Sequence, residues 1–385
     1  MRLLSRMSLP FALLGLALLG PAVGSASADS PFSHAGGNVY VNDNTAGTNT
    51  VAGFARAADG SLTPLPGSPF SAGGAGFGKG LGSQGAIQIT DDGQYLLAVD
   101  AGSNQISVLQ IGQRGSLSLV GSPVSSGGAK PVSIAIDGHL VYVANQGNGV
   151  SGSNYTGFTL YHGVLTPLAD STIALSPTAD PVDVLFNSDG TKLVGTEVGT
   201  SVVDSFTVGW NGLLRAAPGS PLPAQGLGPF GSEFRPTNPN QLFVTNAHNG
   251  AGLGTVSTFN DSWNGTLSSI GTSPFADSQT APCWLIISHD GQYLFAINTG
   301  SGTISRYSIA WNGTLTLLGS TNVAAGGGVG GTDPGLTPDG RYLYVDEAGI
   351  DAVGMFAVSG GSLTELASSP VALPVGATPA GIVVN

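Results

Sequence analysis

The chain has 385 residues, and its 11 Lys and Arg against 23 Asp and Glu give a net charge of −12. Nucleic-acid binding depends on clustered Lys and Arg, so this sparse basic content excludes a nucleic-acid partner. Aliphatic residues are frequent and periodic, which excludes a disordered chain.

The N-terminal segment has the three-part pattern of a secretory signal peptide. Arg2 and Arg6 precede an apolar stretch over residues 9–19, and Ala26-Ser27-Ala28 forms a small-x-small cleavage site. The stretch is shorter than the roughly 18 apolar residues of a transmembrane helix. We therefore predict a signal peptide over residues 1–28, a mature domain over 29–385, and a secreted or periplasmic protein without a transmembrane anchor.

A short phrase, Gly-x-Leu, returns seven times, and six copies continue with Ser or Thr. The copies begin at Gly60, Gly115, Gly163, Gly212, Gly265, Gly313 and Gly361, with gaps of 48 to 55 residues. This period is typical of repeats that contain four strands. Seven such repeats fill the predicted mature chain and leave no room for a second domain.

The sixth repeat shows the expected strands most clearly. Apolar or alternating segments cover residues 283–288, 292–298, 303–310 and 314–318, and Asp290-Gly291 and Asn312-Gly313 are hairpin turn signals. Four antiparallel strands make one propeller blade. The predicted fold is therefore all-β, a single seven-bladed β-propeller.

The two ends of the mature chain predict how the ring closes. Residues 29–37 are polar and Gly-rich, so the first blade lacks an innermost strand upstream. Residues 379–385 have the pattern of the innermost strand over residues 181–187. We expect this C-terminal strand to pair with the N-terminal blade, which leaves no open sheet edge. We also expect a monomer.

A Gly-rich insert over residues 71–85 separates the first two repeats. Residues 73–79 fit the start of a phosphate-binding loop, but Gly80 stands where Ser or Thr must hold magnesium. The insert also lacks the required flanking strand and helix. We predict no nucleotide cofactor and a surface loop over one face of the ring.

Oxygen-bearing side chains recur at the ends of the second strands. The aligned positions are Asp43, Asp100, Asn145, Glu197, Asn246, Asn298 and Glu347. Carboxylate and amide oxygens are ligands of Ca²⁺, so the carboxylates Asp43, Asp100, Glu197 and Glu347 are candidate calcium ligands. The alternative is that these side chains cap turns through hydrogen bonds to backbone amides.

Several recurring motifs resemble those of the lactonase family of seven-bladed propellers. They are the Asp-Gly-x-Tyr-Leu turn at residues 339–343, the strand Leu-Val-Tyr-Val-Ala-Asn at 140–145 and Gly-Ser-Leu-Thr at 60–63. The family includes bacterial 6-phosphogluconolactonase and fungal muconate-lactonising cyclases, and surface propellers with Tyr-Val-Thr-Asn repeats share its motifs. The resemblance covers the mature chain and implies the propeller fold and lactone chemistry.

The inner strands differ from the family pattern, in which Gly-Pro is followed by Arg and His facing the central channel. Here the best match is Gly228-Pro229-Phe230-Gly231. A phosphorylated lactone needs cationic partners for its phosphate, so we expect no 6-phosphogluconolactonase activity. The candidate catalytic residues are Asp183, Glu233, Arg235 and His248, because an Asp or Glu near the channel could act as a general base.

Two functions remain open from the sequence. The first is a scaffold that binds an unidentified small molecule or extracellular protein. The second is a lactone-ring hydrolase or cyclase that acts on an unphosphorylated substrate at the channel mouth. Clustering of the four candidate residues around one pocket would favour the enzyme, and dispersal would favour the scaffold.

Overall fold

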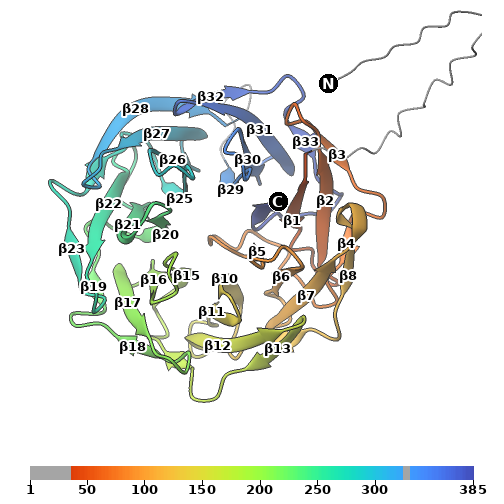
Figure 1. Cartoon of the computed structure of the whole chain (residues 1–385), viewed down its shortest axis with the longest axis horizontal. Helices are drawn as coiled ribbons and strands as arrows, with labels where there is room; N and C mark the ends of the chain where they lie inside the picture. Colours follow the sequence, from red (N-terminus) through yellow and green to blue (C-terminus); the bar gives the residue numbers. More distant parts are fainter. Residues whose placement is uncertain (1–35, 324–329) are drawn as a thin grey trace, which may run out of the picture. The chain divides into compact units, whose positions relative to one another are not determined.

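A computed structural model describes residues 36–323 and 330–385, which form a ring of seven antiparallel sheets (Figure 1). Every described element lies within residues 34–385. The predicted signal peptide and His34 lie outside the described residues. Within these residues, no helix is long and apolar enough to cross a membrane.

Each blade follows the predicted order of strands from the centre outward. Blade 1 contains β1 (Asn38–Asn42), β2 (Thr50–Arg56), β3 (Leu62–Pro64) and β4 (Phe70–Ser71). Blade 2 contains β5 (Ile87–Ile89), β6 (Tyr95–Asp100), β7 (Gln105–Ile111), β8 (Leu117–Leu119) and β9 (Val124–Ser125), with the 3-10 turn η1 (Gln113–Gly115) before β8. Blade 3 contains β10 (Pro131–Asp137), β11 (Leu140–Gln146), β12 (Ser153–Tyr161), β13 (Val164–Pro167) and β14 (Ile173–Ala174).

The remaining blades repeat this order. Blade 4 contains β15 (Pro181–Phe186), β16 (Lys192–Glu197), β17 (Val202–Val208), β18 (Leu214–Ala216) and β19 (Leu222–Pro223). Blade 5 contains β20 (Pro229–Arg235), β21 (Asn238–Asn246), β22 (Thr255–Asp261), β23 (Leu267–Ser269) and β24 (Phe275–Ala276). Blade 6 contains β25 (Pro282–Ile287), β26 (Tyr293–Asn298), β27 (Thr303–Ile309) and β28 (Leu315–Asn322). Blade 7 contains β29 (Gly331–Leu336), β30 (Tyr342–Glu347), β31 (Ala352–Ser359), β32 (Ser362–Glu365) and β33 (Val371–Ala372).

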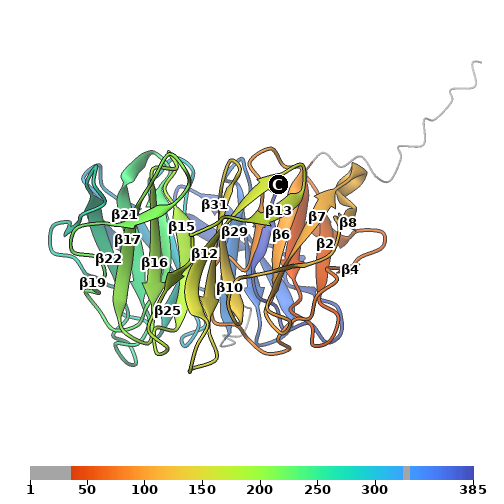
Figure 2. The ribbon, with the colours of Figure 1, turned by 90° about the horizontal axis from the view of Figure 1, so that it is seen from below.

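The C-terminal strand closes the ring as predicted. β34 (Ile382–Val384) pairs antiparallel with β1 and supplies the innermost strand of blade 1. In six blades a short extra strand also pairs with the third strand, whereas blade 6 has one long outer strand instead. The strands of each blade run between the two faces of the ring (Figure 2). Four strands thus form the frame of every blade.

The Gly-x-Leu phrase marks the turn into each outer strand. All seven glycines have φ between 75° and 87°, a region that favours Gly because it has no Cβ. A Cβ at Gly60 would come within 2.4 Å of the Tyr342 ring of blade 7. The Tyr of the Asp-Gly-x-Tyr turn therefore packs on the Gly of the next blade, so the two recurring motifs meet at blade interfaces.

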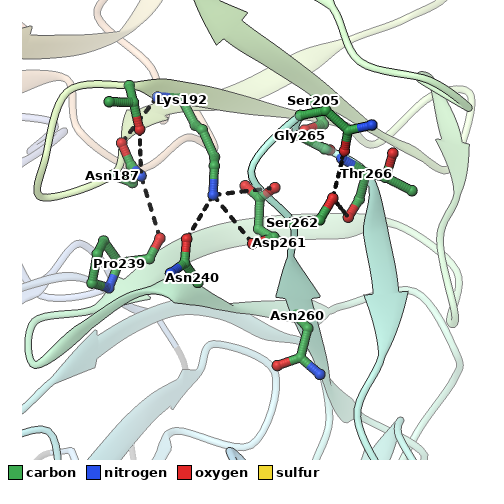
Figure 3. Close-up of polar contacts among 12 residues, drawn as sticks. Asn187, Lys192, Ser205, Pro239, Asn240, Asn260, Asp261, Ser262, Gly265 and Thr266 are labelled. Carbon is green, nitrogen blue, oxygen red and sulfur yellow. Dashed lines mark hydrogen bonds and ion pairs between the residues drawn. The ribbon is translucent and has the colours of Figure 1, made fainter.

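Hydrogen bonds and one buried ion pair link neighbouring blades at the same level. The hydroxyls of Tyr40, Tyr142 and Tyr344 donate to carbonyls of Gly115, Gly212 and Gly60 in the next blade, at 2.8 to 2.9 Å. Between blades 4 and 5, Lys192 Nζ lies 3.7 Å from Asp261 Oδ1 and donates to Asn240 Oδ1 at 2.7 Å (Figure 3). These contacts join blade 1 to blade 2, blade 3 to blade 4, blade 4 to blade 5 and blade 7 to blade 1.

Candidate functional site

The inner strands surround the centre of the ring (Figure 1) and carry a shared irregularity. The pairing register shifts near the start of β10, β15, β20, β25 and β29. A bulge re-aims the side chains that follow it and is frequent at functional sites. Ser133, Asp183 and Ser232 are the first paired residues after three of these shifts.

The end of the Gly-rich insert enters the channel rather than covering one face. Gln84 N–H donates to Val182 O at 3.0 Å, and Trp284 Nε1–H donates to Ser83 O at 2.7 Å. Gly85 N–H donates to Asp333 Oδ2 at 3.1 Å. These bonds attach one short segment to the inner strands of blades 4, 6 and 7.

Gln84 also reaches blades 5 and 6 through its side chain. Its amide donates to Ser232 O at 3.1 Å and accepts from Leu285 N–H at 3.0 Å. Two cavities flank the segment, one of about 330 Å³ and one of about 240 Å³, and Asp333 lines both. The insert therefore builds the wall of a site in the channel.

The larger cavity, which we call the channel cavity, has apolar walls with few polar groups. Its polar side chains are Gln84, Gln88, Ser232, Glu233 and Asp333. None of the described residues that line it is Lys, Arg or His. A concave apolar site with a few convergent polar groups is the usual form of a small-molecule site.

Asp183 lies behind this cavity and is hydrogen-bonded within the wall. Its Oδ2 accepts from Ser232 N–H at 2.7 Å and from Ser232 Oγ–H at 2.6 Å, and Oδ1 accepts from Ser133 Oγ–H at 3.4 Å. Burial raises the pKa of Asp183 to about 7, although these hydrogen bonds lower it. Asp183 therefore orients Ser232 and adds negative potential to the channel when it is ionised.

Glu233 and Asp333 are the two carboxyls that line the channel cavity. Burial, then the proximity of Asp183 and Asp333, raises the pKa of Glu233 to about 8, although a hydrogen bond from Ile287 N–H lowers it. Burial and Asp183 also raise the pKa of Asp333 well above its usual value. Carboxyls with raised pKa in a cavity are candidates for general acid and base roles.

Of the four predicted catalytic residues, only Glu233 is among the described residues that line the channel cavity. Arg235 donates to Gly291 O at 2.8 Å and to Gln241 Oε1 at 2.9 Å, so it joins blades 5 and 6. A second register shift, between Phe234 and Arg235, interrupts the alternation that would place Arg235 beside Glu233. His248 is exposed in the loop after β21.

The predicted calcium ligands occupy the expected strand ends, one in each of four blades. Asp43 accepts from Thr50 Oγ1–H at 2.7 Å, Asp100 accepts from Ser107 and from Asn49 Nδ2–H, and Glu197 accepts from Thr200. Burial raises the pKa of Glu347 to about 7. Across residues 36–323 and 330–385, no three His, Cys, Asp or Glu side chains form a group that could hold a metal ion. Calcium binding stays a prediction.

Asp333, Gln84 and Gln88 were not predicted from the sequence. Asp333 lies in β29, which begins at Gly331 and carries a register shift before Pro334. Gln84 follows the glycines of an insert that we expected to lie on the surface. Pro opens the inner strands β10, β15, β20 and β25 but not β29, so this signal does not indicate Asp333. No sequence signal indicates that the insert enters the channel.

The sequence of the chain matches a family model described as "Lactonase, 7-bladed beta-propeller" over residues 30–160 and 235–383. The chain belongs to this lactonase family. Asp183 and Glu233 fall in the unmatched part between the two segments, whereas Asp333 lies within the second. The family match therefore covers most of the ring, including Asp333.

Solved structures agree with the family assignment. A candidate 6-phosphogluconolactonase from Bacteroides uniformis is 21% identical with a TM-score of 0.72, covering 90% of this chain and 99% of that one. The periplasmic gluconolactonase PpgL from Pseudomonas aeruginosa is 20% identical with a TM-score of 0.70, covering 90% of this chain and 98% of that one. No curated protein sequence matches the chain. At these identities the structural likeness shows the fold alone.

Proposed function

We propose that this protein hydrolyses an unphosphorylated lactone in the channel cavity. The observation that carries the proposal is the presence of Glu233 and Asp333, two carboxyls with raised pKa, in the wall of one cavity of about 330 Å³. The gluconolactonase name of the Pseudomonas relative supports the same chemistry. The proposal sets the lactonase alternative above the scaffold because Glu233 shares the cavity wall with a second carboxyl, Asp333.

The chemistry assigned to the cavity is general-base hydrolysis. Ionised Glu233 removes a proton from water, and the water oxygen forms a bond to the lactone carbonyl carbon. The ring C–O bond then breaks, and the proton passes from Glu233 to the leaving alkoxide, which gives a hydroxy acid. Gln88, which also lines the cavity, supplies an amide N–H for the carbonyl oxygen.

The charge of the cavity selects against anionic substrates. Ser232, Gln84 and Gln88 are neutral, and Glu233 and Asp333 become negative on ionisation. A phosphate group would meet these carboxylates without a cationic partner. An uncharged sugar lactone fits this lining, and a sugar-phosphate lactone does not.

The experiment compares lactone hydrolysis by the wild type, Glu233→Gln and Asp183→Asn. The substrates are glucono-δ-lactone, γ-butyrolactone and 6-phosphogluconolactone, with the spontaneous rate subtracted. We expect hydrolysis of an unphosphorylated lactone and a loss of about 100-fold or more in kcat for Glu233→Gln, as for removal of a general base. The wild-type rate should rise with pH toward about 8 as Glu233 ionises.

The matched control is Asp277→Asn, which changes a buried carboxyl that lines neither the channel cavity nor the smaller cavity beside it. It should keep the wild-type kcat. The proposal would be contradicted if the wild type hydrolysed none of the three lactones, or if the Glu233→Gln variant kept the wild-type rate. If 6-phosphogluconolactone were hydrolysed faster than the two unphosphorylated lactones, the assigned substrate class would be wrong.

Export is part of the proposed function. We infer that the chain is cleaved after Ala28, because the small-x-small site follows an apolar stretch of signal-peptide length. The lactone would then be an extracellular or periplasmic compound. N-terminal sequencing of the protein recovered from culture fluid or periplasm should begin at Asp29, and a product that retains Met1 would contradict the inference.

A binding scaffold stays the second candidate. The observation that favours it is the dispersal of Arg235 and His248 away from the cavity that holds Glu233. A scaffold would bind the same lactone without turnover. Calorimetric binding of glucono-δ-lactone that Glu233→Gln weakens, in the absence of hydrolysis by the wild type, would support the scaffold over the enzyme.

A further inference from the structure

Three tryptophans project from the same turn of three successive blades. Trp210, Trp263 and Trp311 begin the Trp-Asn-Gly turns between the third and fourth strands of blades 4, 5 and 6. Their exposed fractions are 99%, 88% and 88%. Large aromatic side chains are rarely left this exposed without a partner, and exposed Trp is enriched where ligands bind.

One groove adjoins the first of these turns, and a second groove lies beside it. One groove of about 440 Å³ lies between blades 3 and 4 and is lined by Trp210 and Tyr161. A second groove of about 350 Å³ lies between blades 2 and 3 and is lined by Tyr161 and Tyr95. His139 and Tyr161 line both grooves, so they form the ridge that separates them.

The ridge is a fixed aromatic pair. The His139 and Tyr161 rings have centroids 4.3 Å apart and planes inclined by 31°. His139 Nδ1–H donates to Leu160 O at 3.0 Å, which holds the imidazole in place. Tyr161 nevertheless stays 53% exposed. A rigid, half-exposed aromatic surface can bind a ligand without a large loss of side-chain entropy.

Polar side chains line the two grooves around these rings. Asp91 and Gln94 line the groove between blades 2 and 3, and Asp137, Thr159 and Asn211 line the groove between blades 3 and 4. Carboxylates and amides accept and donate hydrogen bonds to hydroxyl groups. The same carboxylates repel anionic lipid surfaces and nucleic acids.

We propose that the Tyr161–His139 ridge, Trp210 and the two grooves beside them form a binding site for a neutral polysaccharide. Aromatic rings stack on the apolar C–H faces of sugar rings, and the groove carboxylates and amides bind the hydroxyls. The groove carboxylates would also attract a basic peptide, which is therefore the alternative ligand that the experiment below distinguishes. The Trp turns of blades 5 and 6 provide further stacking positions, as a polymer of repeated sugar units would need.

Affinity gel electrophoresis tests the proposal with cellulose derivative, xylan, galactomannan and β-glucan as immobilised probes. We expect retention by at least one polymer, weakened 10-fold or more by Tyr161→Ala combined with Trp210→Ala. Trp263→Ala and Trp311→Ala should weaken retention less. The matched control is Val375→Ala, which truncates another fully exposed apolar side chain and should leave retention unchanged.

The melting temperature of each variant shows whether it is folded, and tryptophan fluorescence provides a second measure of polymer binding. The variants should melt like the wild type, because the truncated side chains are exposed. Polymer binding should shift the tryptophan emission of the wild type to shorter wavelength, and Trp210→Ala should reduce that shift. Absence of retention on all four polymers, or retention that the double variant keeps, overturns the proposal. Retention by polylysine that Asp137→Asn abolishes would overturn it in favour of a basic peptide.

Discussion

Two carboxyl groups inside the ring, those of Asp261 and Glu233, differ in the charge of their neighbours. At the interface of blades 4 and 5, Lys192 Nζ lies 3.7 Å from the Asp261 carboxylate. Burial raises the pKa of Asp261 to about 6, although the positive charge of Lys192 lowers it. In the channel, Glu233 has only Asp183 and Asp333 as charged neighbours, and its pKa rises to about 8. An ion pair suits a structural interface, whereas uncompensated carboxyls reduce stability and are retained where they act.

Replacing Lys192, the cation between blades 4 and 5, should have the largest effect on stability. Lys192→Met leaves Asp261 buried without its partner, so we expect the free energy of unfolding at pH 7 to fall by about 3 kcal/mol. Urea unfolding measures the change. Adding Asp261→Asn should restore most of the loss, because the buried charge is then gone. Equal stability of Lys192→Met and wild type would show that the pair contributes nothing.

Removing a carboxyl from the channel should stabilise the protein, but only at high pH. Because the folded-state pKa of Glu233 is raised to about 8, its protonated form stabilises the fold below the unfolded-state pKa of about 4.5, and this stability is lost as pH rises through 8. Glu233→Gln should therefore change the free energy of unfolding little at pH 4.5 and raise it progressively as the pH increases to 8.

Urea unfolding at both pH values provides the measurement. The control is Asp59→Asn, because Asp59 is an exposed carboxyl whose pKa is lowered by hydrogen bonds from Ser61. It should give no stabilisation at pH 8. Destabilisation by Glu233→Gln at pH 8 would mean that the ionised carboxylate has a partner in the channel, which would end the contrast with Asp261.

The hydrogen bonds that support the channel carboxyls should have a smaller effect. Ser232→Ala removes the hydroxyl that donates to Asp183 Oδ2 at 2.6 Å, and the backbone bond from residue 232 stays. We expect a loss of about 1 kcal/mol in the free energy of unfolding. It should also raise the pKa of Asp183, followed by the carboxyl carbon signal in NMR. A lower pKa would be inconsistent with the hydrogen bond seen here.

Metal removal should have the smallest effect. Asp43, Asp100 and Glu197 accept hydrogen bonds from nearby hydroxyl or amide groups, so we expect chelator to change the melting temperature by less than about 1 °C. Differential scanning fluorimetry with calcium and with chelator measures the shift. A fall of several degrees in the melting temperature on chelation would instead support calcium binding by the predicted ligands.

The fold could be predicted because its signals are local. Each Gly of the Gly-x-Leu phrase has a positive φ, and each Asp-Gly turn reverses a hairpin, so both motifs report backbone geometry directly. The pairing of β34 with β1 could also be predicted, because residues 379–385 repeat the inner-strand pattern where blade 1 lacks one. The extra strand in six blades was missed because two paired residues leave little periodicity to detect.

The candidate site was predicted only in part, because it depends on how the inner strands are offset. Glu233 lines the channel cavity, whereas Asp183 lies behind the wall, where it accepts hydrogen bonds from Ser232, and their catalytic role stays a prediction. Arg235 was expected beside them, but the register shift after Phe234 turns it to the interface with blade 6. A one-residue shift reverses the side of a strand on which a side chain lies, and sequence patterns do not show such shifts.

By itself, the sequence determined the seven-bladed ring, its closure by the C-terminal strand, and the shortage of basic residues at the inner strands. Only the tertiary structure decided that Gln84 enters the channel, that Asp333 joins Glu233 in one cavity, and that Tyr161 and Trp210 share a groove. The physical reason is the range of the interactions. Turn geometry and strand alternation act within a few residues, whereas the cavity and the groove bring together residues of different blades.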